Sequence, residues 1–394
     1  MPRSTAATTV RVVPKSIPNL TGGSKRIVAQ PVCVTLEAGT ARSVAFAFLP
    51  SMFQNFYGNR AAAEALFAMT RQERIPQTIL LSGPEGVGKA TLTRRFAGAL
   101  LGGAEKIEQD DLSLAHNAEI VAEREKWPAD KRNEDPLLFA SHPDFVTFPP
   151  DGPLRQIGIE QMRLIKERAQ FKPLHGKRRV FLIDQIDRAN EQAANSLLKT
   201  LEEPPEHLIL LLTAENSYDL LPTIRSRAVP FHLGPLSNAE MRTFVETRGL
   251  SDPERRIALA AGSPGLAVSM DLDVYDERRR AMLALLQVAA GRAAFGEWAK
   301  HAEAMAPRRQ DKLDHLLGIL YVLLEDILLL REGAGEIRNI DIRRQLEDLA
   351  GHVSFQWIRS AVKKSDELAE LVRRNIQKSI ALDALVVELR RLAA

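Results

Sequence analysis

The chain has 394 residues, of which 45% are hydrophobic and 26% are charged, and its formal net charge is +3. That length suggests two or three domains. The small net charge excludes a protein that attracts nucleic acid through a strong overall basic field. The single cysteine, Cys33, excludes disulfides and thiolate metal sites from the folded part. We expect a cytoplasmic protein, because a reducing compartment fits this cysteine usage.

Residues 1–51 form an N-terminal extension that we expect to be disordered. Residues 1–50 carry six basic side chains and one acid, and they are rich in small and polar residues without sustained periodicity. They lack the continuous apolar core of a secretory signal. Their low acid content also fits an organellar presequence. A mis-assigned start, with the true one at Met52, is the simpler interpretation, because structured sequence begins there.

Residues 52–235 alternate strand-like and helix-like segments. Apolar runs of strand length occupy residues 77–83, 178–187 and 207–216, and helical patterns lie between them, such as AANSLLKTLEE after the second run. This alternation predicts a parallel α/β sheet. Residues 105–140 interrupt it with a charged insertion, which we expect to be helical in part and solvent-facing.

Beyond the α/β region the strand patterns end and helices follow. Residues 237–240 and 251–254 both have the Ser-x-x-Glu spacing of a capping box, so each predicts the start of a helix. We predict a helical lid over residues 236–292 and a second helical domain over 293–394. The apolar run 316–330 is too short to span a bilayer and contains two acids, which favours a buried bundle helix.

The segment 81–91, LSGPEGVGKAT, has the pattern of a phosphate-binding loop between a strand and a helix. Gly83, Gly86 and Gly88 would let backbone N–H groups turn inward around a phosphate, and the helix N-terminus adds its dipole. Lys89 would reach the β- and γ-phosphates.

Two positions depart from the pattern of a nucleotide hydrolase. Ala90 stands where a Ser or Thr hydroxyl would hold Mg²⁺, and the adjacent Thr91 is a candidate replacement. Asp184 ends an apolar strand and would hold Mg²⁺ through water, but Gln185 follows where a hydrolase has a Glu that accepts a proton from the attacking water. ATP with Mg²⁺ is the candidate cofactor, and these residues leave open whether nucleotide binds.

Three segments carry a resemblance to a known family: IDQIDRANEQAANSLLKTLEEPP at 183–205, LLPTIRSRA at 220–228 and AAGSPGLA at 260–267. They resemble the bacterial clamp-loader group of AAA+ proteins, and within it the delta-prime subunits of DNA polymerase III. The resemblance covers residues 52–275 well. It implies an AAA+ P-loop α/β domain, a small helical lid, and an all-α collar that joins subunits into a ring.

The resemblance also implies roles for particular residues. Ser226 and Arg227 correspond to the motif that supplies an arginine finger to the neighbouring ATPase subunit, and Thr213 falls at the family's first sensor. Leu266 stands where motor members carry a sensing arginine. With Gln185 in place of the catalytic acid, this implies a non-motor subunit that is not a competent ATPase by itself. The alternative is an active gamma/tau-type clamp-loader ATPase.

The implied partners are the gamma/tau and delta subunits, the sliding clamp and primed DNA, with no membrane contact. Arg163 and Lys166 are candidate contacts to the DNA backbone, while solvated helix charges are the alternative interpretation. Many relatives carry a four-cysteine zinc module after the phosphate-loop helix. This chain has no cysteine there, so we expect no zinc and no other resident metal.

Overall fold

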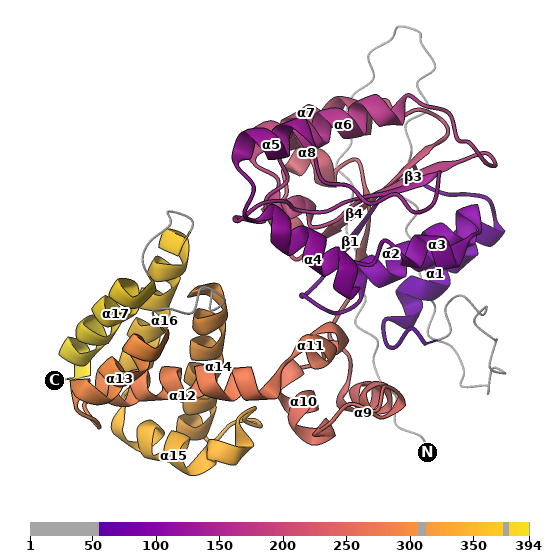
Figure 1. The fold of residues 1–394 in the computed structure, drawn as a ribbon. Helices are drawn as coiled ribbons and strands as arrows, with labels where there is room; N and C mark the ends of the chain where they lie inside the picture. The colour runs from indigo at the N-terminus through magenta and orange to yellow at the C-terminus, as the bar shows by residue number, and fades with distance from the viewer. Residues whose placement is uncertain (1–54, 306–312, 373–377, 394) are drawn as a thin grey trace, which may run out of the picture. The chain divides into compact units, whose positions relative to one another are not determined.

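The computed structural model describes residues 55–305, 313–372 and 378–393. The extension predicted over residues 1–51 lies outside the described residues. The strands are β1 (Thr78–Ser82), β2 (Phe145–Phe148), β3 (Arg179–Ile183), β4 (Leu208–Ala214) and β5 (Val229–His232). They form a five-stranded parallel sheet in the order β2-β3-β4-β1-β5 (Figure 1).

The helices of the α/β part alternate with these strands. They are α1 (Arg60–Arg71), α2 (Lys89–Leu101), α3 (Ala104–Glu108), α4 (Ala115–Arg124), α5 (Ala129–Glu134), α6 (Ile159–Ala169), α7 (Glu191–Glu202) and α8 (Pro222–Arg225). The predicted parallel α/β sheet is confirmed. The sequence patterns located β1, β3 and β4 but missed β2 and β5, because a four-residue strand is too short to show a period.

Helices cover both faces of the sheet (Figure 1). On β1, Ile79 and Leu81 pack in one apolar core with α1 and α2, whereas Leu80 packs in the other core with α6 and α7. Successive side chains of a strand point to opposite faces, so a strand that is buried on both faces is apolar throughout. This explains why the central strands appear in the sequence as continuous apolar runs.

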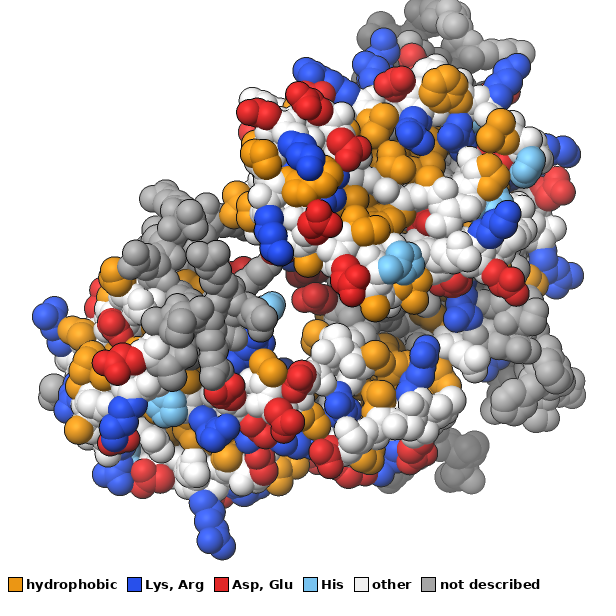
Figure 2. Space-filling model, in the orientation of Figure 1, with side chains coloured by type: hydrophobic (Ala, Val, Ile, Leu, Met, Phe, Trp, Pro, Cys, Tyr) orange, Lys and Arg blue, Asp and Glu red, His pale blue; other side chains and the backbone are white. Residues whose placement is uncertain are grey.

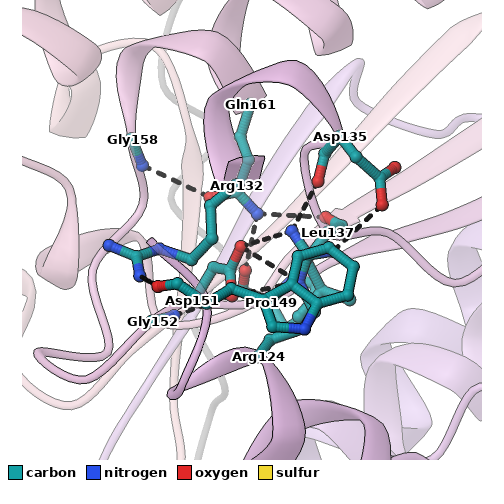
Figure 3. Close-up of polar contacts among 10 residues, drawn as sticks. Arg124, Arg132, Asp135, Leu137, Pro149, Asp151, Gly152, Gly158 and Gln161 are labelled. Atoms are coloured by element: carbon teal, nitrogen blue, oxygen red, sulfur yellow. Dashed lines mark hydrogen bonds and ion pairs between the residues drawn. The ribbon is translucent and has the colours of Figure 1, made fainter. Parts of the chain in front are cut away.

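The charged insertion is helical, as expected, but parts of it are buried. Arg124 in α4 has only 4% of its surface exposed. Its guanidinium donates to Asp151 at 2.7 Å and to Asp135 at 3.2 Å, and it stacks 4.6 Å from the centre of the Trp127 ring (Figure 3). The expectation of a solvent-facing insertion is therefore wrong for Arg124. Its burial is tolerated because its guanidinium donors have acceptors. These contacts attach α4 to the chain that follows β2.

Three short helices follow β5, namely α9 (Asn238–Thr247), α10 (Pro253–Ala260) and α11 (Pro264–Ser269). The capping box predicted at the start of α9 is confirmed, because Ser237 accepts from the backbone N–H of Glu240, whose carboxylate accepts from Ser237. The second predicted box is wrong. Asp252 is the N-cap of α10, in a left-handed conformation and without a side-chain cap bond. The backbone carbonyl of Ser251 instead accepts from Nε of Arg256 at 2.8 Å.

The remaining helices share a further apolar core. They are α12 (Leu272–Ala289), α13 (Phe295–Met305), α14 (Leu313–Glu332), α15 (Arg343–His352), α16 (Phe355–Val372) and α17 (Lys378–Ala393). The predicted bundle helix at residues 316–330 is confirmed as part of α14. Its Asp326 is fully buried and accepts from the backbone N–H groups of Arg338 and Asn339, at 2.8 and 3.0 Å. No helix within the described residues is long and apolar enough to cross a membrane.

Candidate functional site

The loop predicted to bind phosphate, called the phosphate loop below, connects β1 to α2 at the carboxyl end of β1. Gly83, Gly86 and Gly88 all have positive φ values, of 149°, 73° and 98°. A Cβ atom at Gly83 would lie 2.1 Å from the backbone oxygen of Leu233, so that position accepts no side chain. The loop therefore has the backbone that turns N–H groups toward an anion, at the N-terminus of a 13-residue helix.

Lys89 is the first residue of α2 and is buried, with 8% of its surface exposed. Its Nζ donates to the carbonyl oxygens of Gly83 and Pro84, at 2.6 and 2.8 Å. Burial lowers the pKa of Lys89, and the nearby carboxylates of Glu215 and Asp184 oppose that shift. The ammonium thus lies over the loop, where it would meet the oxygens of a bound phosphate.

Asp184 and Thr213 lie side by side at the ends of β3 and β4. The sheet register pairs Ile183 with Leu212, which brings the following residues to the same level. Thr213 donates to the Asp184 carboxylate at 2.5 Å and accepts from the backbone N–H of Gln185 at 2.8 Å. Burial raises the pKa of Asp184, while the bond from Thr213 opposes the rise. The proposed sensor threonine and the proposed Mg²⁺ carboxylate are therefore directly bonded.

Gln185 has a left-handed backbone conformation, with φ of 54°. Such a conformation is uncommon for a residue other than glycine, and it is most often found at functional or tightly constrained positions. Here the bond from its N–H to Thr213 holds it. The side chain is an amide and cannot accept a proton from water, so the geometry of the site does not change the chemistry that the sequence indicated.

The first turn of α11 contacts the tip of the phosphate loop. Ser263 donates to the carbonyl oxygen of Glu85 at 2.9 Å, and the N–H of Gly265 donates to the carbonyl oxygen of Gly86 at 2.8 Å. A Cβ atom at Gly86 would lie 2.2 Å from the Ser263 hydroxyl. Leu266 follows this contact and is 37% exposed. These two hydrogen bonds join the loop to the start of α11.

The loop and its surroundings fit a phosphate group better than they fit Mg²⁺. The glycine backbone and Lys89 supply donors for phosphate oxygens. For a magnesium ion, Ala90 offers no hydroxyl, and one oxygen of Asp184 already accepts from Thr213. Thr91 is partly buried in the first turn of α2. No group of three or more His, Cys, Asp or Glu that could hold a metal occurs in the described part of the chain.

Ser226 and Arg227 follow α8 directly. Among the described residues, their side-chain hydrogen bonds join them to Thr223, to Glu202 and to each other, and not to the phosphate loop. Arg227 donates to the carbonyl oxygen of Thr223 at 2.8 Å and to the Glu202 carboxylate at 2.7 Å. Its side chain remains 32% exposed. Beside it, Arg225 stacks 5.1 Å from the ring of Tyr218, which is 80% exposed. Arginine and an exposed tyrosine are residue types enriched at protein interfaces.

Several residues around the two sites were not predicted from the sequence. The loop side gains Ser263 and the carboxylates of Asp187 and Glu215, which lie close enough to Lys89 to affect its pKa. The Arg227 surface gains Glu202 and Thr223. Ser263, Asp187, Glu202 and Thr223 lie within segments that carry the family resemblance, so that signal was present. Glu215 lies outside them and had no local signal, because acids are common on any surface.

The face of the molecule drawn in Figure 2 shows no broad basic area over the described residues. On the face drawn in Figure 2, basic and acidic side chains are interspersed over the described residues. Arg163 is exposed on α6 and pairs with Glu160 at 2.5 Å, three residues before it. Lys166 is also exposed on that helix. A pocket of about 510 Å³ is lined by residues that include Lys106, His142 and His175. It lies next to the C-terminal end of α2, whereas the phosphate loop lies at the N-terminal end of that helix.

The α/β part is similar to known replication proteins. A family model described as "DNA polymerase III, delta subunit" matches residues 58–237. The DNA polymerase III subunit delta' of Escherichia coli K12 is 28% identical over 217 residues, which is 54% of this chain and 63% of that protein. The subunit delta' of Pseudomonas aeruginosa PAO1 is 33% identical over 195 residues, covering 47% and 52%.

Subunit tau/gamma of Haemophilus influenzae is similar to the same part of the chain, with 28% identity over 194 residues, covering 49% of this chain and 25% of that protein. The chain therefore spans less than two thirds of the length of each of these relatives. The predicted resemblance is confirmed at the level of the family, and the parallel sheet followed by helices confirms the predicted fold class. Over residues 58–237 the chain is therefore similar to the delta-prime subunits of the DNA polymerase III clamp loader.

Proposed function

We propose that this chain is a non-motor, delta-prime-like subunit of a DNA polymerase III clamp loader, which helps to place the sliding clamp on primed DNA. Its partners would be gamma/tau and delta subunits, as the names of the similar proteins suggest. The observation that carries the proposal is that the phosphate loop lacks groups needed for ATP hydrolysis while Arg227 is present and exposed on another surface. Gln185 and Ala90 remove two parts that hydrolysis needs, while Arg227 is exposed and makes no contact with the chain's own loop among the described bonds.

In this proposal Arg227 acts on a nucleotide bound to the neighbouring subunit. An arginine that approaches the transferring phosphoryl group stabilises its developing negative charge, and such fingers raise hydrolysis by about 10³–10⁵ in related switch proteins. Ser226 shapes the turn that presents the arginine, since its hydroxyl donates to the Thr223 oxygen at 3.2 Å. The DNA contact would be to the backbone and sensitive to salt.

The test is a ring reconstituted with gamma/tau and delta subunits, in which Arg227→Ala replaces the normal chain. We expect the DNA-stimulated ATPase rate of the ring to fall while the ring still assembles, as judged by light scattering. Arg60→Ala is the control for loss of an exposed, ion-paired arginine, since Arg60 lies on α1 and pairs with Glu64. Unchanged ATPase in the Arg227→Ala ring would remove the role of the finger.

The second candidate, an active gamma/tau-type ATPase, is favoured by one observation: the glycines and Lys89 form a complete phosphate cradle. The isolated chain distinguishes the two. We expect the isolated chain to show negligible ATP turnover. A calorimetric titration with ATP and Mg²⁺ then measures whether the phosphate loop binds nucleotide. Robust turnover that is lost on Lys89→Ala would establish the gamma/tau-type function instead.

A further inference from the structure

The guanidinium of Arg227 is held by its own chain. Two of its nitrogens carry the contacts: Nη1 donates to the Thr223 carbonyl oxygen at 2.8 Å and reaches the Ser226 hydroxyl at 3.4 Å, while Nη2 donates to Glu202 at 2.7 Å. Both terminal nitrogens therefore donate to groups of this chain. Before a phosphate on another subunit can take the N–H groups that now donate to Thr223 and Glu202, Arg227 has to leave these acceptors.

Glu202 lies where a helix does not favour an acid. It is the last residue of α7, and the partial negative charge at a helix C-terminus disfavours a carboxylate in the last turn. Glu203 and Glu206 add two more acids within the next four residues. The ion pair with Arg227 offsets this cost for Glu202, and it joins α7 to the end of α8 across 25 residues of sequence.

The ion pair is exposed enough to be broken. The two side chains are 32% and 49% exposed, so water screens their attraction. Exposed ion pairs shift an equilibrium by about five-fold at most. A nucleotide triphosphate carries several charged oxygens and accepts stronger, charge-assisted hydrogen bonds from arginine. The Glu202 carboxylate therefore favours the docked position of Arg227 only weakly, so a nucleotide phosphate can replace it.

We propose that Glu202 is the resident counter-ion of Arg227, which keeps the guanidinium docked on its own subunit until the phosphate oxygens of a neighbour's nucleotide displace it. This inference rests on the proposed function, because it assigns Arg227 a target in trans. It makes Glu202 a positioning residue that sets how readily the finger is released. Removing its negative charge should favour the released state by up to about five-fold.

The contact is tested first in the isolated full-length chain. Phenylglyoxal modifies arginine side chains, and mass spectrometry of peptides gives the rate at each one. We expect Glu202→Gln to speed the modification of Arg227 by up to about five-fold, while Arg225 in the same peptide region keeps its rate. Glu203→Gln is the matched control, since it removes the same charge one residue further on. No change at Arg227, or the same change with Glu203→Gln, would overturn the proposal.

The consequence is tested in the reconstituted ring, with ATP turnover measured against ATP concentration. We expect Glu202→Gln to raise kcat/KM by up to about five-fold, and the double variant Glu202→Gln with Arg227→Ala to match Arg227→Ala alone, because the two residues act through one contact. If Arg227→Ala lowers turnover but Glu202→Gln leaves it unchanged, the counter-ion role fails and the finger stands. If Arg227→Ala has no effect, the proposed function fails and the competition fails with it.

Discussion

At the phosphate loop, the important side chains are buried and bonded within the interior. At the Arg227 surface, the important side chains are half-exposed and bonded to each other and to neighbouring backbone. Lys89, Asp184 and Thr213 are each less than a tenth exposed. Arg227 and Glu202 keep a third to a half of their side-chain surface in water. The first region resists change because its polar groups have no alternative partner in the interior. The second can exchange its partner for another at little cost.

Of the substitutions that test this difference between the two regions, Gly83→Ala is expected to change the free energy of unfolding most. Gly83→Ala places a Cβ atom 2.1 Å from the Leu233 carbonyl oxygen, and backbone cannot move aside as a side chain can. We expect a loss of about 3–4 kcal/mol in the free energy of unfolding, measured by urea denaturation. Gly249→Ala is the control, because Gly249 also has positive φ, 61°, but has open space around its Cβ position. It should cost about 1 kcal/mol, and equal losses would contradict the packing argument.

A smaller effect is expected from the hydroxyl that joins β4 to β3. Thr213→Val removes the bonds to the buried Asp184 carboxylate and to the half-buried N–H of Gln185, so both groups lose this partner. The expected cost is about 2–3 kcal/mol in the free energy of unfolding. The same substitution at Thr147 on β2 provides the control. Its hydroxyl is buried and has no hydrogen-bond partner among the described residues. Thr147→Val should therefore be neutral or stabilising, and a similar loss at both sites would refute the assignment.

The buried side of the comparison extends to His142, next to the end of α2. His142 is 6% exposed, and its Nδ1 accepts from the backbone N–H of Asp144 at 3.1 Å. Burial lowers the pKa of His142 below its usual 6.5. The unfolded chain then binds a proton that the folded chain does not, so stability rises with pH and is lost as the pH falls below about 6.5.

We expect acidification from pH 7 to pH 5.5 to destabilise the normal chain more than His142→Asn, by roughly 0.5–1 kcal/mol. Asparagine retains an oxygen that can accept from the Asp144 N–H but does not titrate. Urea denaturation of both chains at the two pH values gives the difference between them. Parallel losses in the two chains would show that other groups cause the pH dependence.

The smallest effect on stability is expected at the Arg227 surface. Glu202→Gln breaks an ion pair between half-exposed side chains, for which we expect a change of about 0.2–1 kcal/mol in the free energy of unfolding. The pair should also weaken with added salt, since exposed charges are screened. Thermal unfolding at low and high salt checks both points. A loss as large as that of Thr213→Val would mean that this surface is structural, which would break the comparison.

The sequence by itself determined the features that depend on neighbouring residues. The strand-loop-helix pattern around Lys89, the helix that ends before Pro204, and the missing groups at Ala90 and Gln185 could all be found there. The apolar period of a helix or strand and the φ requirements of glycine are local, so they leave a local record.

Only the tertiary structure decided which distant groups meet. The Ser263 hydroxyl bonds to the Glu85 carbonyl across 178 residues, and Glu202 meets Arg227 across 25. The burial of Arg124 depends on Asp151, which lies 27 residues further along the chain. Hydrogen bonds and ion pairs between polar side chains have no period and no composition of their own. They form where the packing of the sheet and helices brings distant parts of the chain together. The ion pair between Glu202 and Arg227, on which the release of Arg227 is proposed to depend, is one of these contacts.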